Sequence, residues 1–152
     1  MNRIGKEYND FCIIVDTPNI SKSAWIGYFT LLDGSGGLTI EDNVSISSGV
    51  QIVTHSTHVR NVRESKKEFG SRDIIRKPVK IERGCFIGTN STILMGVTIG
   101  HHSVIGAGSV VNKSIPPYSL AAGVPCKVIG STLKYLDKER EDEDKNTIRK
   151  DN

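Results

Sequence analysis

Aliphatic residues recur at every sixth position along most of the chain. A period of six is neither the 3.6-residue repeat of an α-helix nor the simple alternation of a single strand. It is typical of a solenoid in which each flat face is one short strand followed by a turn. The repeating positions fall into three runs: Ile14, Ile20, Ile26 and Leu32; Ile40, Ile46 and Ile52; and Ile81, Ile87, Ile93, Ile99, Ile105 and Val111.

Glycine often follows the leading aliphatic residue, as at Gly88, Gly100 and Gly106. A glycine there permits a tight corner, so the pattern predicts an all-β fold, a three-sided parallel β-helix. Three six-residue units form one triangular coil, and stacked coils turn the leading residues into one continuous core. The expected coils are led by residues 20/26/32, 40/46/52, 81/87/93 and 99/105/111, which places Leu32 directly beneath Ile52.

The repeat is interrupted twice. Residues 34–37, Gly-Ser-Gly-Gly, shift the spacing by two positions, and glycine-rich sequence of this kind predicts an enlarged corner. Between Ile52 and Ile81 the spacing stops, and a long polar excursion of about residues 53–78 takes its place. Long loops in compact domains are more often functional than accidental, so we expect this one to carry part of a site.

Length and composition fit one domain followed by a charged tail. The chain has 152 residues and a net charge of +3, with no apolar run of membrane-spanning length and no signal-peptide pattern. Its three cysteines are scattered, which favours reduced thiols in a cytoplasmic protein. We expect the β-helix to occupy residues 1–130. Residues 131–152 should form a short C-terminal helix, docked by its first turn through Leu133, Tyr135 and Leu136, and then a frayed end.

Three segments carry a resemblance to a known family. They are residues 49–58 (GVQIVTHSTH), 78–100 (PVKIERGCFIGTNSTILMGVTIG) and, most specifically, 105–130 (IGAGSVVNKSIPPYSLAAGVPCKVIG). They resemble the hexapeptide-repeat O- and N-acyltransferases, in particular the maltose and galactoside acetyltransferases and their small relatives from polysaccharide and nucleotide-sugar gene neighbourhoods. The resemblance implies left-handed coils, a homotrimer, and acetyl-CoA as co-substrate with no metal. The implied acceptor is a hydroxyl or amine of a sugar, polysaccharide or nucleotide-sugar.

Acyl transfer from a thioester needs a base that takes the acceptor's proton as it attacks the carbonyl carbon. Histidine suits this task because its pKa lies near neutrality. The resemblance implies a catalytic histidine at the root of the long loop, where this chain has both His55 and His58. His55 continues the coil from Ile52 and is slightly favoured, whereas His58 is nearer the spacing of the galactoside acetyltransferases. His101 and His102 lie inside a regular repeat and are interpreted as an outward corner.

Asp33 is a candidate substrate-binding residue one coil below the His55 region, because it follows Leu32 and Leu32 stacks beneath Ile52. Its carboxylate is suited either to orient an imidazole or to bind a sugar hydroxyl. Asp-Gly is also a common corner pair, so turn chemistry explains the same residue equally well. The family's active-site asparagine one repeat earlier corresponds to Gly27 here, so the acceptor site departs from the family pattern.

The resemblance marks the donor side more fully. In the family, CoA lies between neighbouring subunits, against late coils and a few cations. Its contact positions correspond here to Thr89, Ala107, Asn112, Lys113 and Lys127. Lysines suit the CoA phosphates, and small residues around Ala107 let the pantetheine arm approach the backbone. Gly130 replaces a second basic residue of the family, and Phe86 replaces a frequent tryptophan, either beside the arm or as ordinary packing.

Two other functions fit parts of the sequence. A γ-class carbonic-anhydrase-like zinc enzyme shares the β-helix but needs three histidines that converge between subunits, and residues 105–130 argue against it. A non-catalytic assembly module is disfavoured by the histidines at the loop root and by the two lysines. The excursion carries seven basic and three acidic residues, a balance suited to anionic CoA or nucleotide-sugars. It lacks interleaved aromatic residues, so nucleic acid is not an expected partner.

Overall fold

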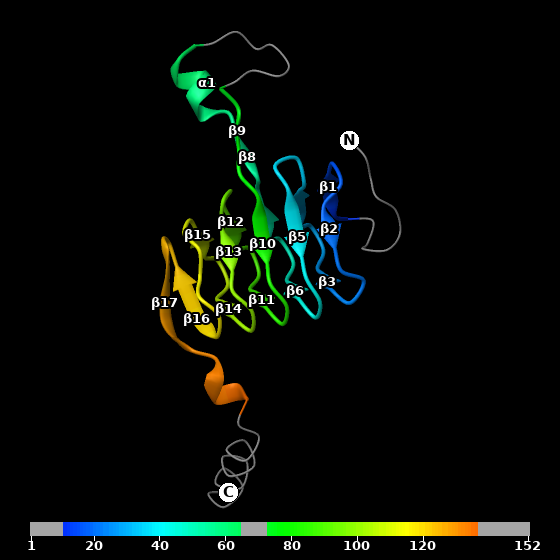
Figure 1. The fold of residues 1–152 in the computed structure, drawn as a ribbon, viewed down its shortest axis with the longest axis vertical. Coiled ribbons are helices and arrows are strands. Elements are labelled where there is room, and N and C mark those ends of the chain that lie inside the picture. The colour runs from blue at the N-terminus through cyan, green and yellow to red at the C-terminus, as the bar shows by residue number, and fades with distance from the viewer. Residues whose placement is uncertain (1–10, 65–72, 137–152) are drawn as a thin grey trace, which may run out of the picture.

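The computed structural model describes residues 11–64 and 73–136. They form a parallel β-solenoid in which three sheets wrap around one core (Figure 1). Sheet A contains, in spatial order, β1 (Ile13–Val15), β4 (Leu31–Asp33), β7 (Gln51–Ile52), β12 (Thr92–Ile93) and β15 (Val110–Val111). Sheet B contains β13 (Thr98–Ile99), β10 (Val79–Ile81), β5 (Leu38–Ile40) and β2 (Asn19–Ile20). Sheet C contains β17 (Cys126–Ser131), β16 (Ser119–Gly123), β14 (Val104–Ile105), β11 (Phe86–Ile87), β6 (Ser45–Ile46) and β3 (Trp25–Ile26).

The register of the sheets confirms the predicted coils. Leu32 pairs with Ile52, and Ile52 pairs with Ile93 although the long excursion separates them in sequence. Ile14 stacks beneath Leu32 and adds a strand before the first predicted coil. All the leading aliphatic residues except Ile20 are buried. The core is therefore a column of aliphatic side chains that each coil extends by one layer.

Close approach between coils explains the glycine that follows a leading residue. A Cβ atom on Gly88 would lie 2.5 Å from the backbone nitrogen of Ala107 on the next coil, which is closer than Cβ atoms approach backbone. Residues 34–37 form the enlarged corner that the sequence predicts, and Gly37 there has a φ of +96°. Glycine adopts that conformation without the steric cost of a side chain.

The excursion leaves the solenoid directly after β7. It begins with β8 (His55–Ser56), continues as the short helix α1 (His58–Val62), and returns through β9 (Ile75–Arg76), which pairs antiparallel with β8. Figure 1 shows this pair carrying the excursion away from the body of the solenoid. Residues 65–72 of the predicted excursion lie outside the described residues.

The C-terminal end departs from the six-residue pattern. β16 and β17 form an antiparallel hairpin on sheet C, which the repeat does not predict. A 3₁₀ turn, η1 (Leu133–Tyr135), follows it, and residues 137–152 of the predicted helix and frayed end lie outside the described residues. Among the described residues no helix is long and apolar enough to cross a membrane.

The docking of the tail differs from the expectation. Leu133, Tyr135 and Leu136 are all exposed, so the prediction that they pack against the solenoid is wrong. The buried Thr132 makes the contact instead, because its hydroxyl donates to the backbone oxygen of His102 at 2.6 Å. A hydrogen bond therefore holds the start of the turn where apolar packing was expected.

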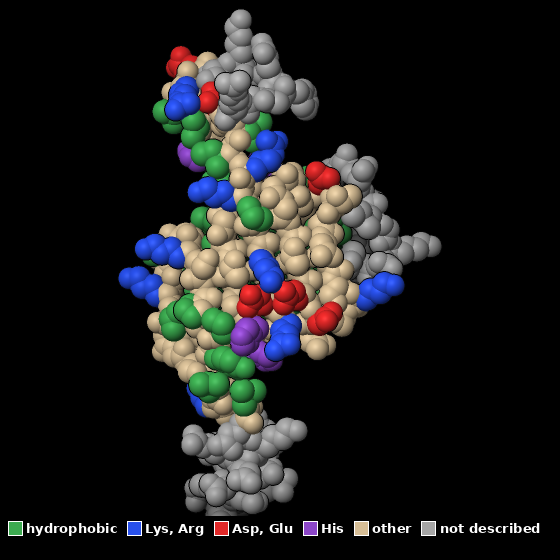
Figure 2. Space-filling model, in the orientation of Figure 1, with side chains coloured by type: hydrophobic (Ala, Val, Ile, Leu, Met, Phe, Trp, Pro, Cys, Tyr) green, Lys and Arg blue, Asp and Glu red, His purple; other side chains and the backbone are tan. Residues whose placement is uncertain are grey.

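The outer faces of the sheets differ in chemistry. On sheet B, the Lys80 ammonium lies 2.9 Å from a Glu41 carboxylate oxygen and 3.7 Å from one of Glu82. Figure 2 shows acidic and basic side chains gathered on this face. On sheet C, Trp25 and Phe86 point outward in register with Ser45 between them, and both aromatic side chains are exposed.

Candidate active site

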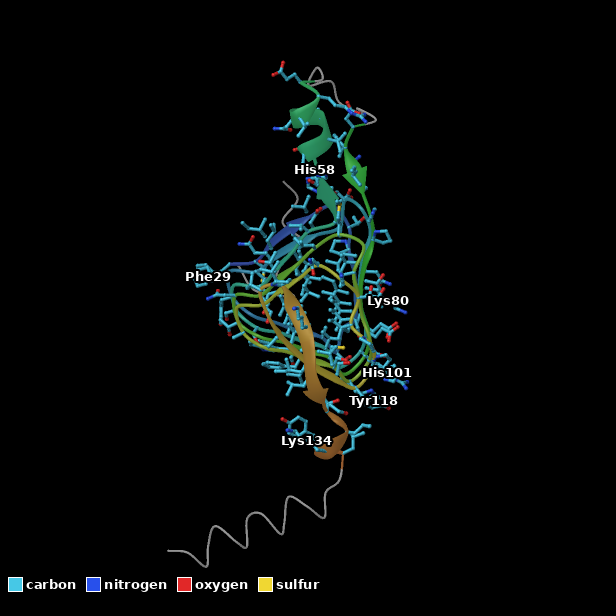
Figure 3. The ribbon with its side chains drawn as sticks, turned by 90° about the vertical axis from the view of Figure 1, so that its left-hand side faces the viewer. Phe29, His58, Lys80, His101, Tyr118 and Lys134 are labelled. Carbon is cyan, nitrogen blue, oxygen red and sulfur yellow. The ribbon has the colours of Figure 1, made fainter. Side chains whose placement is uncertain are left out.

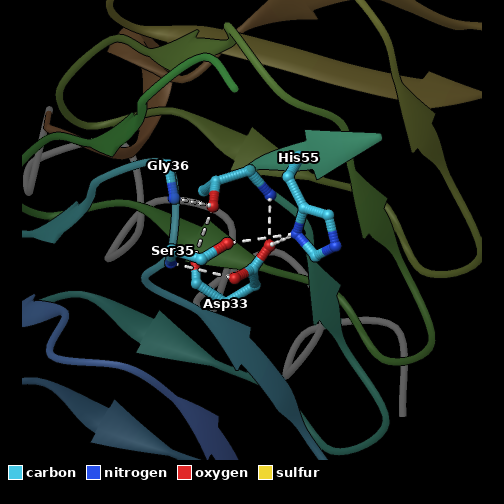
Figure 4. Close-up of polar contacts among 5 residues, drawn as sticks. Asp33, Ser35, Gly36 and His55 are labelled. Carbon is cyan, nitrogen blue, oxygen red and sulfur yellow. Dashed lines mark hydrogen bonds and ion pairs between the residues drawn. The ribbon is translucent and has the colours of Figure 1, made fainter. Parts of the chain in front are cut away.

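Asp33 and His55 meet at the corner where sheet A ends. Asp33 is the last residue of β4, and His55 is the first residue of β8 on the next coil. The His55 Nδ1 atom lies 2.7 Å from Asp33 Oδ2 and 3.1 Å from the Ser35 hydroxyl oxygen (Figure 4). Stacking Leu32 beneath Ile52 produces this contact, because each site residue follows one of these two core residues closely.

The Asp33 carboxylate is buried and well supplied with donors. It is only 2% exposed. The Thr54 backbone N–H donates to Oδ2 at 2.9 Å, and the Ser35 backbone N–H donates to Oδ1 at 2.9 Å. Burial alone would raise the pKa of this carboxyl, but these bonds, together with those from the Ser35 hydroxyl and His55, hold its pKa well below the usual range. Asp33 is therefore a carboxylate at neutral pH.

Thr54 fixes the shape of the corner beneath the pair. Its buried hydroxyl donates to the backbone oxygen of Asp33 at 3.0 Å and accepts from the backbone N–H of Gly36 at 2.8 Å. Neither Thr54 nor Ser35 was predicted from the sequence as part of the site. The signal for Ser35 was present, since an aspartate two residues before a serine in a glycine-rich corner is typical of an Asx turn.

The hydrogen bonds assign the tautomer of His55. An anionic carboxylate only accepts, so Nδ1 carries the proton and donates it to Asp33. In the neutral ring the other nitrogen, Nε2, then carries no hydrogen and can accept a proton. The His55 side chain is 42% exposed, so this nitrogen is accessible from solvent. The arrangement is that of a base whose orientation and tautomer are set by a buried carboxylate.

His58 has a different environment. It is the first residue of α1, and its Nδ1 atom lies 2.6 Å from the hydroxyl oxygen of Ser56, two residues before it in the chain. This contact is local to the excursion, whereas the contact of His55 joins two coils. The two candidate bases are thus distinguished by their partners, a neighbouring serine hydroxyl for one and a buried carboxylate for the other.

The donor-side candidates are all exposed and come from the last three coils. Thr89 and Ala107 occupy stacked corners between sheets C and A, where the Gly108 backbone N–H donates to the Thr89 oxygen at 2.8 Å. Asn112 and Lys113 follow β15, and Lys127 lies on β17, the strand that contacts β15. Phe86 points outward from β11 and is exposed, and Gly130 lies on β17.

His101 and His102 occupy a different corner, between sheets B and C, as the sequence predicts. The His102 ring stacks on Tyr118 with centroids 5.3 Å apart, and the two Nδ1 atoms of the histidines lie 3.0 Å apart. Figure 3 shows His101 and Tyr118 together and far from His58. Among the described residues no group of three or more His, Cys, Asp or Glu side chains is placed to share a metal ion.

Known proteins resemble this chain in sequence and in fold. The family described as the hexapeptide repeat of succinyl-transferase matches residues 78–113. Galactoside O-acetyltransferase from Escherichia coli is 43% identical over 94 residues, which are 60% of this chain and 43% of that protein. The chain thus matches less than half the length of this relative. A hexapeptide-repeat-containing acetyltransferase from Vibrio cholerae is 32% identical with a TM-score of 0.58, covering 80% of this chain and 70% of that chain.

A further solved structure shares the fold at lower identity. An N-acyltransferase from Bacillus cereus, in complex with dTDP and 3-hydroxybutyryl-CoA, has a TM-score of 0.72 at 23% identity. The superposition covers 93% of this chain and 77% of that chain. The common architecture is the left-handed β-helix, as the family resemblance implies.

Proposed function

The chain belongs to the hexapeptide-repeat acetyltransferase family, and from this premise we propose that it transfers an acetyl group from acetyl-CoA to a hydroxyl or amine of a sugar or nucleotide-sugar. The observation that carries the proposal is the contact of 2.7 Å between His55 Nδ1 and the buried Asp33 carboxylate. This pair supplies what acyl transfer needs, an imidazole whose orientation and tautomer are fixed and whose second nitrogen can accept a proton.

His55 is the proposed general base. Its Nε2 atom takes the proton of the acceptor hydroxyl or amine as the oxygen or nitrogen attacks the thioester carbonyl carbon. The carbon–sulfur bond then breaks, and the leaving CoA sulfur takes the proton back from the imidazolium. Asp33 stabilises that imidazolium without being protonated itself, because its pKa is held well below the usual range. His58 is a second candidate for the base, with the Ser56 hydroxyl as its partner.

The donor-side proposal uses the corner that carries Thr89 and Ala107. Small residues there leave room for the pantetheine arm beside the backbone, and the Lys113 and Lys127 ammonium groups would bind the CoA phosphates. Asn112 would hydrogen-bond beside them. The two lysines belong to the C-terminal end of the solenoid, so the thioester end of the donor would lie toward the N-terminal coils.

The acceptor class rests on the relatives. The matched relative from Escherichia coli is described as acting on galactosides, which supports a sugar as acceptor of this chain. Asp33 is less suited to hold a sugar hydroxyl directly than the sequence alone suggested, because its carboxylate oxygens already accept from Thr54, Ser35 and His55. Its proposed role is therefore to orient His55.

A cyclic homotrimer is the proposed assembly, with a mass of roughly 50 kDa from three chains of 16.6 kDa. The outward-facing Trp25 and Phe86 on sheet C are exposed apolar groups of the kind that a second copy covers. Within one chain, the donor corner and His55 stand at opposite ends of sheet A. This separation supports a site that is completed between neighbouring copies.

An acceptor screen tests the proposed function. We would measure CoA release from acetyl-CoA with a thiol reagent across a panel of galactosides, glucosides, amino sugars and nucleotide-linked amino sugars. The expected result is release that depends on one class of sugar acceptor and is lost in His55→Ala. If no sugar stimulates release, while the protein is folded and binds acetyl-CoA, the proposed acceptor class is wrong.

A further inference from the structure

The corner between sheets C and A contains one residue that breaks the pattern of its neighbours. Successive coils place Phe29, Gly49, Asn90 and Gly108 at equivalent positions, because each backbone N–H donates to the preceding coil in the same way, at 2.8–3.1 Å. All four have positive φ, between +57° and +73°. Glycine and asparagine are the residues that adopt this conformation readily, whereas a bulky aromatic residue seldom does.

The side chain of Phe29 is hardly buried by its own chain, so burial does little to offset the cost of this backbone conformation. Its side chain is 71% exposed, and Figure 3 shows it projecting from the corner on the side opposite Lys80. Tyr118 offers a contrast, since it also has positive φ but stacks on His102 and is half-buried. A strained residue without matching burial indicates a role outside the chain.

Two further aromatic residues surround Phe29. The ring of Phe11 lies 5.5 Å from that of Phe29 and 6.0 Å from that of Tyr28, and the Tyr28 and Phe29 rings are 6.5 Å apart. All three side chains are at least half exposed. We call these three residues the aromatic corner. Their rings are tilted against one another by 49–57°, so together they present both ring faces and ring edges to solvent.

The aromatic corner continues the column that carries the proposed donor residues. Tyr28, Ser48, Thr89 and Ala107 occupy equivalent corner positions on successive coils, as the strand register and the backbone hydrogen bonds show. Neighbouring strands are about 4.8 Å apart, so Tyr28 lies roughly 10 Å from Thr89 along the column. Small residues line the part of the column that is assigned to the pantetheine arm. The aromatic residues begin further along the column, where the acetyl end of the donor would lie.

We propose that the aromatic corner binds the acceptor, by stacking the apolar C–H face of a sugar ring on Phe29 and Tyr28. This inference rests on the proposed function, because the position of the acetyl end decides what must lie beside it. Sugar rings have one face made mainly of C–H groups, and exposed aromatic rings bury such a face while hydroxyl groups stay hydrated. The proposal therefore assigns acceptor affinity to the aromatic corner and proton transfer to His55, which a neighbouring copy brings to the same acetyl group.

The decisive variant is Phe29→Asn, because the equivalent position of a later coil is Asn90 in the same backbone conformation. We expect the variant to keep or raise its melting temperature and to keep the oligomeric mass of the wild type. Its KM for the sugar acceptor should rise about fivefold or more, while KM for acetyl-CoA stays unchanged. Tyr135→Ala is the matched control, since it removes another exposed aromatic side chain that lies on η1.

A binding measurement separates this proposal from the proposed function. Saturation-transfer NMR would be recorded with methyl glycosides of galactose, glucose, mannose and N-acetylglucosamine and with UDP-linked sugars as probes. Ring-proton signals that appear with the wild type and vanish in Phe29→Asn support the proposal, even if no acetyl transfer is found. The proposal would be overturned if no probe gave a signal or if the signal were unchanged in the variant. It would also be overturned if the variant lost oligomeric mass, because a second copy of the chain would then be what covers the aromatic corner.

Discussion

Two corners of the solenoid present histidine, and they use it in opposite ways. At the corner between sheets A and B, His55 contacts the buried Asp33 carboxylate at 2.7 Å and leaves its other nitrogen accessible. At the corner between sheets B and C, His102 stacks on Tyr118 and the two adjacent histidines contact each other at 3.0 Å. His55 lies on strand β8 and His102 lies in a turn with a φ of +57°, and the partner of each imidazole decides what that ring can do.

The difference shows why a histidine on a repeat is not by itself a site. A buried carboxylate fixes one tautomer and stabilises the charged ring, which is what proton transfer requires. A stacked tyrosine and a second imidazole hold the ring in place, and the backbone oxygen of His102 accepts a hydrogen bond from Thr132 at the start of the tail. We therefore expect loss of catalysis from changes at the first corner and loss of stability from changes at the second.

The largest effect should come from His55→Ala. Removing the proposed general base should lower kcat by about 10²–10⁴-fold with little change in affinity for acetyl-CoA. His101→Ala and His58→Ala should lower kcat much less. Steady-state kinetics and calorimetric titration of acetyl-CoA would measure both quantities. If His58→Ala proves the more damaging change, the base is His58 and the comparison between the two corners fails.

Asp33→Asn should come second, with kcat lower by about 10²-fold because the amide can no longer hold His55 as an anionic acceptor does. It should also change the pH dependence of stability. The pKa of Asp33 in the fold lies below its ordinary value of 3.8, so its stabilising contribution is complete above that value and is lost as the pH falls through the lower, folded pKa.

Urea unfolding of the wild type and Asp33→Asn at pH 7 and pH 2.5 measures this contribution. We expect the wild type to exceed the variant in unfolding free energy at pH 7, and the gap to narrow at pH 2.5. A gap of equal size at both values would mean that the carboxylate does not gain its stability from the donors around it.

A smaller effect, confined to donor binding, is expected from Lys113→Ala and Lys127→Ala. One charge-assisted hydrogen bond to a phosphate contributes about 1.5–3 kcal/mol, so each variant should weaken acetyl-CoA binding roughly tenfold or more. KM should rise more than kcat falls, and added salt should reduce the difference. Lys80→Ala, on the charged face of sheet B, is the control and should leave affinity unchanged. A lower melting temperature with unchanged affinity would instead give Lys127 a structural role.

The smallest effect on activity should come from His102→Asn, because asparagine tolerates the positive φ of +57° at this position. The variant should stay within about twofold of wild-type kcat and lose roughly 1 kcal/mol of unfolding free energy with the lost stacking on Tyr118. Thermal and urea unfolding would measure the loss. A fall in kcat as large as that of His55→Ala would remove the distinction between the two corners.

The sequence predicted the coils because spacing alone constrains them. A leading aliphatic residue every sixth position can be buried only if each coil stacks in register, and so Leu32 had to meet Ile52. The same argument brought Asp33 near His55. It could not separate orienting an imidazole from binding a sugar, because that choice depends on the hydrogen bonds from Thr54 and Ser35, and these follow from the exact path of the enlarged corner.

The end of the chain was less predictable for a physical reason. After Val111 the six-residue repeat stops, and β16 pairs antiparallel with β17, a contact that leaves no periodic trace in the sequence. The apolar residues of the tail suggested docking, yet Leu133 and Leu136 are exposed and a single threonine makes the contact. Hydrophobic pattern alone does not tell a docked turn from one whose apolar groups face outward.

The antiparallel pair of β8 and β9 holds the two ends of the excursion together at its base, where the Lys77 backbone N–H donates to the Thr54 backbone oxygen at 3.0 Å. Ile52 and Ile93 pair as neighbours whatever lies between the two ends of that hairpin. Each doubling of such a loop costs only about 0.6 kcal/mol in closure entropy. We therefore expect the length of the excursion to be changeable while the Asp33 carboxylate and the His55 imidazole at its root keep their contact.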